Sequence, residues 1–168
     1  MDYGELPVHF SFHGTARLEL QSNQLAGIVP PSLFSLSSLQ ELYLEDNPNL
    51  QGEIPSRIGN MVDLRRLRLG STQIGGTLPP EFFWLTSLVD FLVPQANFRG
   101  ELDPAQWRNL SVLEEWDIGF NNFEGQVPNI FHEMASLREC CIELPWNDNC
   151  YAYFSIYLFY RGYPSSRQ

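Results

Sequence analysis

The sequence has no lysine, few cysteines and no long apolar run. All 10 basic residues are arginine, against 20 Asp and Glu among 168 residues, which gives a formal net charge of −10. Without lysine the chain cannot carry a Walker A phosphate loop, a kinase-type strand lysine or a Schiff-base nucleophile. The acidic balance argues against nucleic acid as a partner, because binding a phosphate backbone requires a positive surface.

The three cysteines lie near the C-terminal end, so they cannot form a disulfide framework for the whole chain. Cys140, Cys141 and Cys150 would form one disulfide in an oxidising compartment or stay thiols in a reducing one, and the sequence leaves both open. The first residues show no basic segment followed by an apolar run, so no signal peptide is expected. No stretch reaches the roughly 18–20 apolar residues of a membrane span, so none is expected in this chain.

Motifs for catalysis and metal binding are also scarce. The histidines are His9, His13 and His132, and the first two lie in a segment with no helical apolar pattern and no third ligand nearby. No Gly-x-Ser-x-Gly, His-Glu-x-x-His or dinucleotide-type glycine motif occurs. We therefore expect no enzyme activity, no metal site and no cofactor.

The chain is organised by an internal repeat of 24 or 25 residues. Six similar segments, here called coils one to six, begin at Leu18, Leu42, Leu67, Phe91, Trp116 and Cys140. Each has a second apolar residue two positions later, an alternation that predicts a short strand with one buried face.

Each coil continues with a turn motif. Five positions after the start, coils one to five carry Asn23, Asn47, Thr72, Ala96 and Asn121. A Gly-x-apolar-Pro element follows in four coils, beginning at Gly27, Gly52, Gly76 and Gly125, whereas coil four has Gly100–Asp103 without the proline. Apolar residues three apart then predict a helical or 3₁₀ turn that returns to the core.

These motifs resemble the leucine-rich repeat family, and the Gly-Pro element resembles its plant-type subclass. Five copies match over about residues 15–137, and a degenerate sixth begins at Leu137. The resemblance implies an α/β solenoid, a right-handed superhelix with a short-stranded parallel sheet on the concave face. It also implies roles such as receptor ectodomains in signalling and inhibitors of cell-wall-degrading enzymes. For a full-length parent it implies the cell surface or secretion; the compartment of this chain stays open.

The repeated polar position predicts a structural ladder. The side chains of Asn23, Asn47 and Asn121 are expected to satisfy backbone groups of their own coil and the next, because a side-chain amide both donates and accepts. Thr72 can do part of this and Ala96 cannot, so coil four is predicted to be the weak joint of the stack.

Equivalent outward positions of the strands should form rows across the concave sheet. The first row begins Arg17, Glu41, Arg66 and Asp90, and its alternating signs predict an ion-pair ladder. The second row contains Tyr43, Arg68, Leu92 and Asp117, a mixture of side-chain types that is common in recognition hot spots. The predicted ligand-binding residues are these four together with the flanking acids Glu19 and Glu45, which would steer a basic partner toward them.

On the convex limb, Phe82, Trp107 and Phe131 are predicted to be buried. Phe83, Trp84 and Ile130 fall between core positions and are expected to be exposed, where they would mark lateral contact with another chain. Asn109-Leu110-Ser111 fits the acceptor pattern for glycosylation on the same limb.

Three segments are expected: an N-terminal flank at 1–14 that adds a capping strand, a repeat domain at 15–147, and an aromatic-rich tail at 148–168 that caps the other end. The predicted function is non-enzymatic recognition of a protein or peptide on the concave face. Two alternatives stay open: a structural fragment of a larger receptor or inhibitor, and a carbohydrate-binding module, which the scarcity of outward aromatics disfavours. The ligand and the oligomeric state are not predicted.

Overall fold

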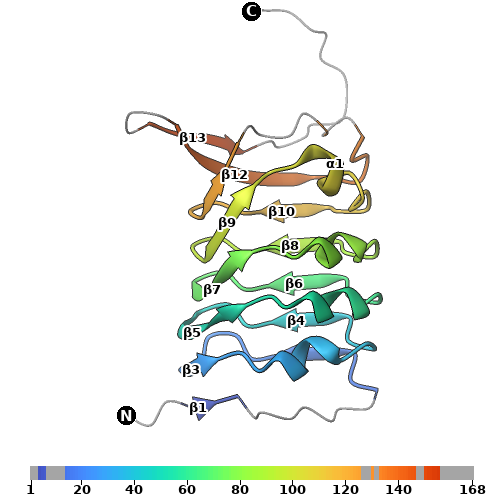
Figure 1. Cartoon of the computed structure of the whole chain (residues 1–168), viewed down its shortest axis with the longest axis vertical. Coiled ribbons are helices and arrows are strands. Elements are labelled where there is room, and N and C mark those ends of the chain that lie inside the picture. The colour runs from blue at the N-terminus through green and yellow to red at the C-terminus, as the bar shows by residue number, and fades with distance from the viewer. Residues whose placement is uncertain (1–3, 7–13, 126–129, 131–132, 147–149, 156–168) are drawn as a thin grey trace, which may run out of the picture.

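The computed structural model shows a solenoid of stacked coils (Figure 1), described for residues 4–6, 14–125, 130, 133–146 and 150–155. The predicted strands form one sheet in the order β13-β12-β10-β8-β6-β4-β2. Its parallel members are β2 (Arg17–Glu19), β4 (Glu41–Tyr43), β6 (Arg66–Arg68), β8 (Asp90–Leu92), β10 (Glu115–Asp117) and β12 (Glu139–Trp146). The fold class predicted from the repeat is therefore confirmed as a leucine-rich repeat solenoid.

A second parallel sheet, which we did not predict, runs through the Gly-x-apolar-Pro segments. It follows the order β1-β3-β5-β7-β9-β11. Its strands are β1 (Gly4–Glu5), β3 (Leu25–Ile28), β5 (Asn47–Glu53), β7 (Thr72–Thr77), β9 (Asn97–Glu101) and β11 (Asn122–Glu124). Gly75 shows why this stretch needs glycine, because a Cβ there would lie 2.1 Å from the backbone oxygen of Asn97.

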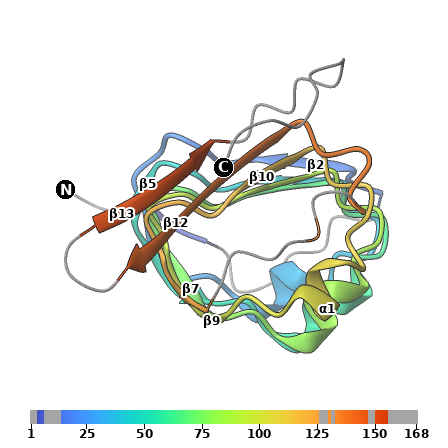
Figure 2. The ribbon, with the colours of Figure 1, turned by 90° about the horizontal axis from the view of Figure 1, so that it is seen from above.

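Short helices form the third side of each coil, and Figure 2 shows them grouped beside the second sheet and away from β10 and β12. Three are 3₁₀ helices: η1 (Pro31–Ser35), η2 (Ser56–Asn60) and η3 (Pro80–Trp84). Coil four instead has α1 (Pro104–Trp107), where Asp103 replaces the repeat proline and its carboxylate accepts a 2.9 Å hydrogen bond from the backbone N–H of Ala105. An aspartate at this position is a favourable N-cap, so the sequence change converts the 3₁₀ turn into a turn of α-helix.

The two 25-residue spacings come from single-residue insertions in different places. In coil two the extra residue lies between Asn47 and Gly52, and the pairing of β5 with β7 shifts register there. In coil four it lies in the limb that contains α1, because Gly100 to Leu110 is one residue longer than Gly76 to Leu85. Neither insertion disturbs the strands of the seven-stranded sheet.

The core runs through the middle of the stack. Strand residues such as Leu42, Leu67 and Phe91 are fully buried. In coils three to five the core is aromatic, and Trp107 stacks on Trp116 with ring centroids 4.3 Å apart. Each large side chain buried in this way contributes about 1.5–3 kcal/mol to folding.

Different strands flank the two ends of the stack. At the N-terminal end, β1 pairs with β3 in parallel, and the adjacent Leu6 is buried. At the C-terminal end, β13 (Cys150–Ser155) pairs with β12 in the antiparallel direction, which breaks the parallel pattern. The apolar alternation at residues 8–12 lies outside the described residues, and the capping roles of 1–14 and 148–168 stay predictions.

Candidate functional site

The strand register places the predicted rows side by side. Arg17 pairs with Glu41, Glu41 with Arg66, and Arg66 with Asp90. The second row is aligned in the same way and contains Glu19, Tyr43, Arg68, Leu92, Asp117 and Cys141. The frame inferred from alternating apolar residues is therefore correct at each of these strands.

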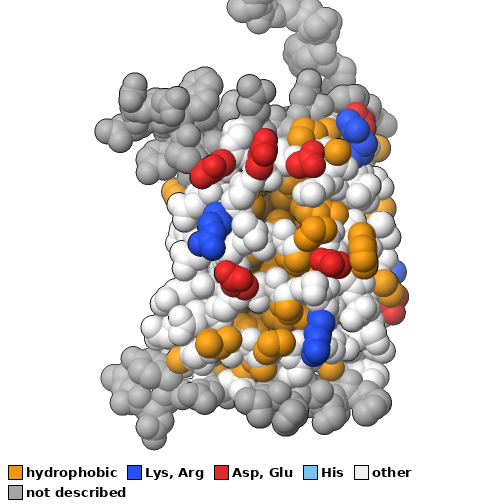
Figure 3. Space-filling view, viewed as in Figure 1, with side chains coloured by type: hydrophobic (Ala, Val, Ile, Leu, Met, Phe, Trp, Pro, Cys, Tyr) orange, Lys and Arg blue, Asp and Glu red, His pale blue; other side chains and the backbone are white. Residues whose placement is uncertain are grey.

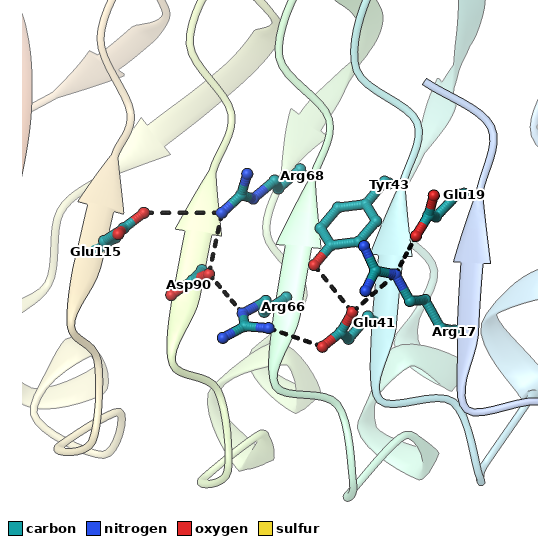
Figure 4. Close-up of polar contacts among 8 residues, drawn as sticks. All are labelled: Arg17, Glu19, Glu41, Tyr43, Arg66, Arg68, Asp90 and Glu115. Atoms are coloured by element: carbon teal, nitrogen blue, oxygen red, sulfur yellow. Dashed lines mark hydrogen bonds and ion pairs between the residues drawn. The ribbon is translucent and has the colours of Figure 1, made fainter. Parts of the chain in front are cut away.

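The first row forms the predicted ion-pair ladder, and Figure 4 shows its continuous chain of contacts. Arg17 Nε lies 3.1 Å from Glu41 Oε2, and Arg66 Nη1 lies 2.8 Å from Glu41 Oε1. Arg66 Nε is 2.9 Å from Asp90 Oδ2. An isolated exposed pair contributes about 0–1 kcal/mol, but Asp90 is only 7% exposed and depends more strongly on its arginines.

Tyr43 is much less accessible than we expected. Only 6% of it is exposed, because its ring lies between the guanidinium carbons of Arg17 and Arg68, at 5.1 and 5.3 Å from the centroid. Its hydroxyl donates a 3.0 Å hydrogen bond to Glu41. Burial, followed by the Glu41 carboxylate, raises the pKa of Tyr43. The residue supports the two arginines, and little of its ring is left for a ligand.

Arg68 is the basic residue of the second row, and 34% of its side chain is exposed. Its Nη2 lies 3.2 Å from Asp90 Oδ2 and 3.8 Å from Glu115 Oε2. Its Nε is buried and has no hydrogen-bond partner among the described residues. The guanidinium is thus oriented by Asp90 and Tyr43, but not all of its N–H groups have a hydrogen-bond acceptor.

The other predicted ligand-binding residues surround Arg68 in different environments. Leu92 is half-buried beside it, and Glu19 at the N-terminal edge pairs with Arg17. Burial raises the pKa of Asp117, although the backbone N–H of Gly119 donates to its carboxylate at 2.9 Å. Burial also raises the pKa of Glu45, whose Oε2 has no hydrogen-bond partner in the described part of the chain.

In the first two rows, arginines and carboxylates balance each other over coils one to four, and the sheet is acidic beyond them. Glu115 lies directly opposite Glu139, and Asp117 stands on the same strand as Glu115. The long 3.8 Å approach of Arg68 to Glu115 is the closest ion pair from a basic residue to these three carboxylates in the described ranges. The C-terminal part of this sheet therefore favours a cation.

The asparagine ladder exists, but its direction differs from our prediction. The Asn47 amide donates to Leu20 O at 2.9 Å and accepts from Leu25 N at 3.0 Å, both in the preceding coil rather than the next. Asn121 repeats this arrangement with Val93 O and Phe98 N of coil four. Among the described residues, Asn23 donates only within its own coil.

At Thr72 and Ala96 the ladder is interrupted. The Thr72 hydroxyl donates to Leu69 O at 2.6 Å, within its own coil, and among the described side-chain bonds it makes none to coil two. The following residues partly compensate on the outer surface, since Gln73 donates to Pro48 O at 2.7 Å and Asn97 to Gln73 O at 3.4 Å. We missed these two amides, although their position next to each defective ladder residue was visible in the sequence.

On the convex side two predictions were wrong. Phe83 and Ile130 are buried, and Phe83 packs edge-on against Trp107 with centroids 5.3 Å apart. Phe82 and Trp107 are buried as predicted, Trp84 is 61% exposed as predicted, and Phe131 lies outside the described residues. The acceptor asparagine Asn109 is exposed just after α1.

Within the described ranges, no group of three or more His, Cys, Asp or Glu side chains is arranged to hold a metal ion. His9, His13 and His132 lie outside these ranges. In the same part of the chain, no helix has the length and apolar character to cross a bilayer. Cys140 is buried in the core, and this burial raises the pKa of its thiol, so it is not a reactive nucleophile.

The stacked coils, the asparagine ladder and the two parallel sheets define a leucine-rich repeat solenoid. Residues 38–61 match the family model described as Leucine Rich Repeat. The chain thus contains a leucine-rich repeat at residues 38–61 and folds as a leucine-rich repeat solenoid, and its repeats are similar to those of plant receptor ectodomains.

Among curated proteins, 55 residues are 42% identical to the LRR receptor-like serine/threonine-protein kinase GSO2 of Arabidopsis thaliana, covering 32% of this chain and 4% of the relative. The Arabidopsis receptor kinase HAESA, solved with the peptide hormone IDA and the co-receptor SERK1, matches at 28% identity and a TM-score of 0.70, over 79% of this chain and 23% of that one. A plant ice-binding protein matches at 34% identity and a TM-score of 0.64, over 70% and 38%. The chain thus spans only a small part of these proteins.

Proposed function

We propose that this chain is a non-enzymatic recognition module of a receptor-like protein and binds a protein or peptide on the seven-stranded sheet. The observation that carries the proposal is the alignment of Arg68, Leu92 and Asp117 on three adjacent strands. They offer a cation, an apolar surface and an acid next to one another, and such mixed sites favour recognition. The match to HAESA, solved with a peptide hormone, supports the same class of ligand, and the match to the HAESA ectodomain supports an extracellular location.

The charge distribution also indicates how the ligand would be oriented on the sheet. Glu115, Asp117 and Glu139 leave the β10–β12 end acidic, whereas Arg68 offers a partly satisfied guanidinium next to it. A ligand with a basic group over β10 and a carboxylate or carbonyl over β6 would be complementary to both. Such a ligand binds across the strands, along the second row.

A peptide-display library tests this proposal, with the whole chain as the immobilised target. Enriched peptides should carry Lys or Arg beside an apolar residue, and Arg68→Glu should weaken them at least tenfold. Arg57→Glu is the matched control, because Arg57 is an exposed arginine on η2, away from the seven-stranded sheet. If no peptide is enriched, or if both variants bind equally, the concave site is refuted.

A second candidate is adsorption to ice, the property in the name of the plant protein matched at 34% identity. It is favoured by uncharged polar side chains on adjacent strands of the second sheet, where exposed Gln51 pairs with exposed Gln73. The exposed charges of Glu53 and Arg99 interrupt this surface. Thermal hysteresis that is lost in Gln73→Lys but kept in Arg68→Glu would support it, and absence of hysteresis would dismiss it.

Carbohydrate binding gains no support from the sheet. Sugar rings stack on open aromatic faces, but the Tyr43 ring is covered by two guanidinium groups. A receptor fragment, our other alternative, is compatible with the proposed function, since the chain covers 4% of the curated receptor kinase that it matches.

A further inference from the structure

A small pocket with a mixed apolar and polar lining opens on the other side of the solenoid. It has a volume of about 110 Å³ and lies where β7 and β9 meet the helical side. Its apolar lining consists of Leu78, Phe83, Trp107 and Phe123, and Arg99, Glu101 and Gln106 also line it. Figure 3 shows apolar side chains gathered in a hollow along the middle of this face, with charged side chains around it.

The pocket lies where coil four departs from the repeat. The limb after Gly100 lacks the repeat proline and is one residue longer than in coil three, so α1 follows η3 instead of another 3₁₀ helix. Gln106 and Trp107 of α1 and Phe83 of η3 all line the hollow. The pocket is therefore lined by the elements in which this coil departs from the repeat.

The size and rigidity of the lining limit the occupant. Trp107 is held by edge contact with Phe83 and by stacking on Trp116, and Phe123 stacks on Phe98 with centroids 6.3 Å apart. Pockets that hold whole drug-sized molecules are roughly 300–1,000 Å³ in volume. A hollow of about 110 Å³ instead accommodates a single aliphatic side chain.

One side of the pocket is acidic, although Arg99 also lines it. Glu101 on β9 lies directly opposite Glu124 on β11, both are exposed, and neither has an ion-pair partner among the described residues. Like charges directly opposite on adjacent strands repel. Arg99, the nearby cation, approaches Glu53 on the opposite side at 4.0 Å. A bound cation would relieve the repulsion between Glu101 and Glu124.

We propose that this pocket is a second binding site, which takes a basic peptide segment. One aliphatic side chain of the peptide would insert into the pocket, and an arginine or lysine would flank that residue on each side. The apolar lining would hold the inserted side chain, and Glu101 and Glu124 would pair with the flanking cation. The site lies away from the seven-stranded sheet, so it stands independently of the function proposed for that sheet.

The test uses an amidated peptide with one leucine between two arginines, titrated into the ¹⁵N-labelled whole chain at low salt. We expect saturable chemical-shift changes at residues 77–78, 99–107 and 123–124, including the Trp107 indole. A peptide with alanine in place of leucine should bind about tenfold more weakly, because the apolar contact is lost. A peptide with glutamines in place of the arginines should bind about tenfold more weakly as well.

Two variants assign the binding to this pocket. The double variant Glu101→Gln, Glu124→Gln removes the negative charge of the acidic side without touching the core and should weaken the peptide about tenfold. The matched control is Asp63→Asn, an exposed acid away from the pocket, which should have no effect. Gln106→Trp, which would fill the opening, should also prevent binding.

The proposal is overturned if the shifts fall only on the seven-stranded sheet, if leucine and alanine peptides change the pocket shifts equally, or if the double variant binds like the control. Arg68→Glu should remove any shifts on the seven-stranded sheet and leave those at the pocket unchanged, so failure here is distinguishable from failure of the concave site. Shifts caused only by a small apolar amine, with none from the peptide, would also refute a peptide site.

Discussion

Asp90 Oδ2 lies 2.9 Å from the Nε of Arg66, and this carboxylate is almost completely buried beneath the surface of the seven-stranded sheet. The same oxygen also lies 3.2 Å from Arg68 Nη2. Asp90 thus joins the ion-pair ladder of the first row to the candidate ligand-binding arginine of the second.

This position predicts that Asp90→Ala lowers the free energy of unfolding by about 1–3 kcal/mol, because two arginines lose a buried acceptor. Urea denaturation with a constant m-value measures the loss. The control is Glu19→Ala, which removes an exposed carboxylate paired with Arg17 alone and should change stability by less than about 0.5 kcal/mol. Equal effects of the two substitutions would show that the ladder does not depend on Asp90.

The ladder asparagines predict a second contrast. Asn47 is fully buried and bonds to both coils one and two, whereas Asn23 is exposed and, in the described part of the chain, bonds only within its own coil. Asn47→Ala should therefore lower the free energy of unfolding by about 2–3 kcal/mol, since buried backbone groups lose their partners. Asn23→Ala should cost less than about 1 kcal/mol in the same denaturation experiment. A larger loss in Asn23→Ala would contradict the role of inter-coil bonds.

Coil four should open more readily than its neighbours, because the methyl side chain of Ala96 cannot form hydrogen bonds to coil three. Amide hydrogen exchange over residues 91–105 is expected to be faster than in the flanking coils. Ala96→Asn should slow it by restoring the bonds that Asn121 makes one coil later. Ala96 is only 7% exposed, so the larger side chain must also fit into the core. Slower exchange in the wild-type segment than in both neighbouring coils would refute the weak joint.

Glu45 predicts a pH dependence. Burial raises the pKa of its carboxyl above the ordinary value of 4.5, so the folded state favours the protonated form more than the unfolded state does. The contribution of this group to stability is therefore fully present below 4.5 and is lost as the pH rises through the higher folded value.

Glu45→Gln keeps the shape of the side chain but removes its charge. Its melting temperature should exceed that of the wild type at pH 7, and the difference should shrink toward zero in acid. Glu53→Gln is the control, because it removes the same charge from a glutamate that is exposed. A wild type that is more stable than Glu45→Gln at pH 7 would show that attraction to Arg68 outweighs burial.

Prediction from the sequence succeeded wherever the repeat imposes a position. Alternating apolar residues determined which side chains of β4, β6 and β8 face outward, because successive side chains of a strand point to opposite faces of the sheet. The repeat spacing predicted that Arg66 and Asp90 lie opposite each other on neighbouring strands, and their opposite charges predicted the ion pair. Asn47 and Asn121 were likewise identified by position, but the coil to which they bond was not, because either neighbour is one repeat away.

Prediction failed where non-repeating side chains compete for space. Tyr43 occupies an outward position, yet two arginines from adjacent strands cover its ring. Phe83 was expected to be exposed between core positions, but the longer limb of coil four brings Trp107 against it. Such contacts depend on how successive coils stack, and pattern within a single coil contains no information about them.

The amino-acid sequence by itself determined the period, the family, the outward rows and the absence of lysine chemistry, because each depends on residue identity and on local strand geometry. Only the tertiary structure decided that the Gly-x-apolar-Pro segments form a second sheet, that Arg68 rests on Tyr43, and that a pocket with one acidic side lies beside α1. These features come from contacts between coils, where single-residue insertions and side-chain volumes determine which groups meet.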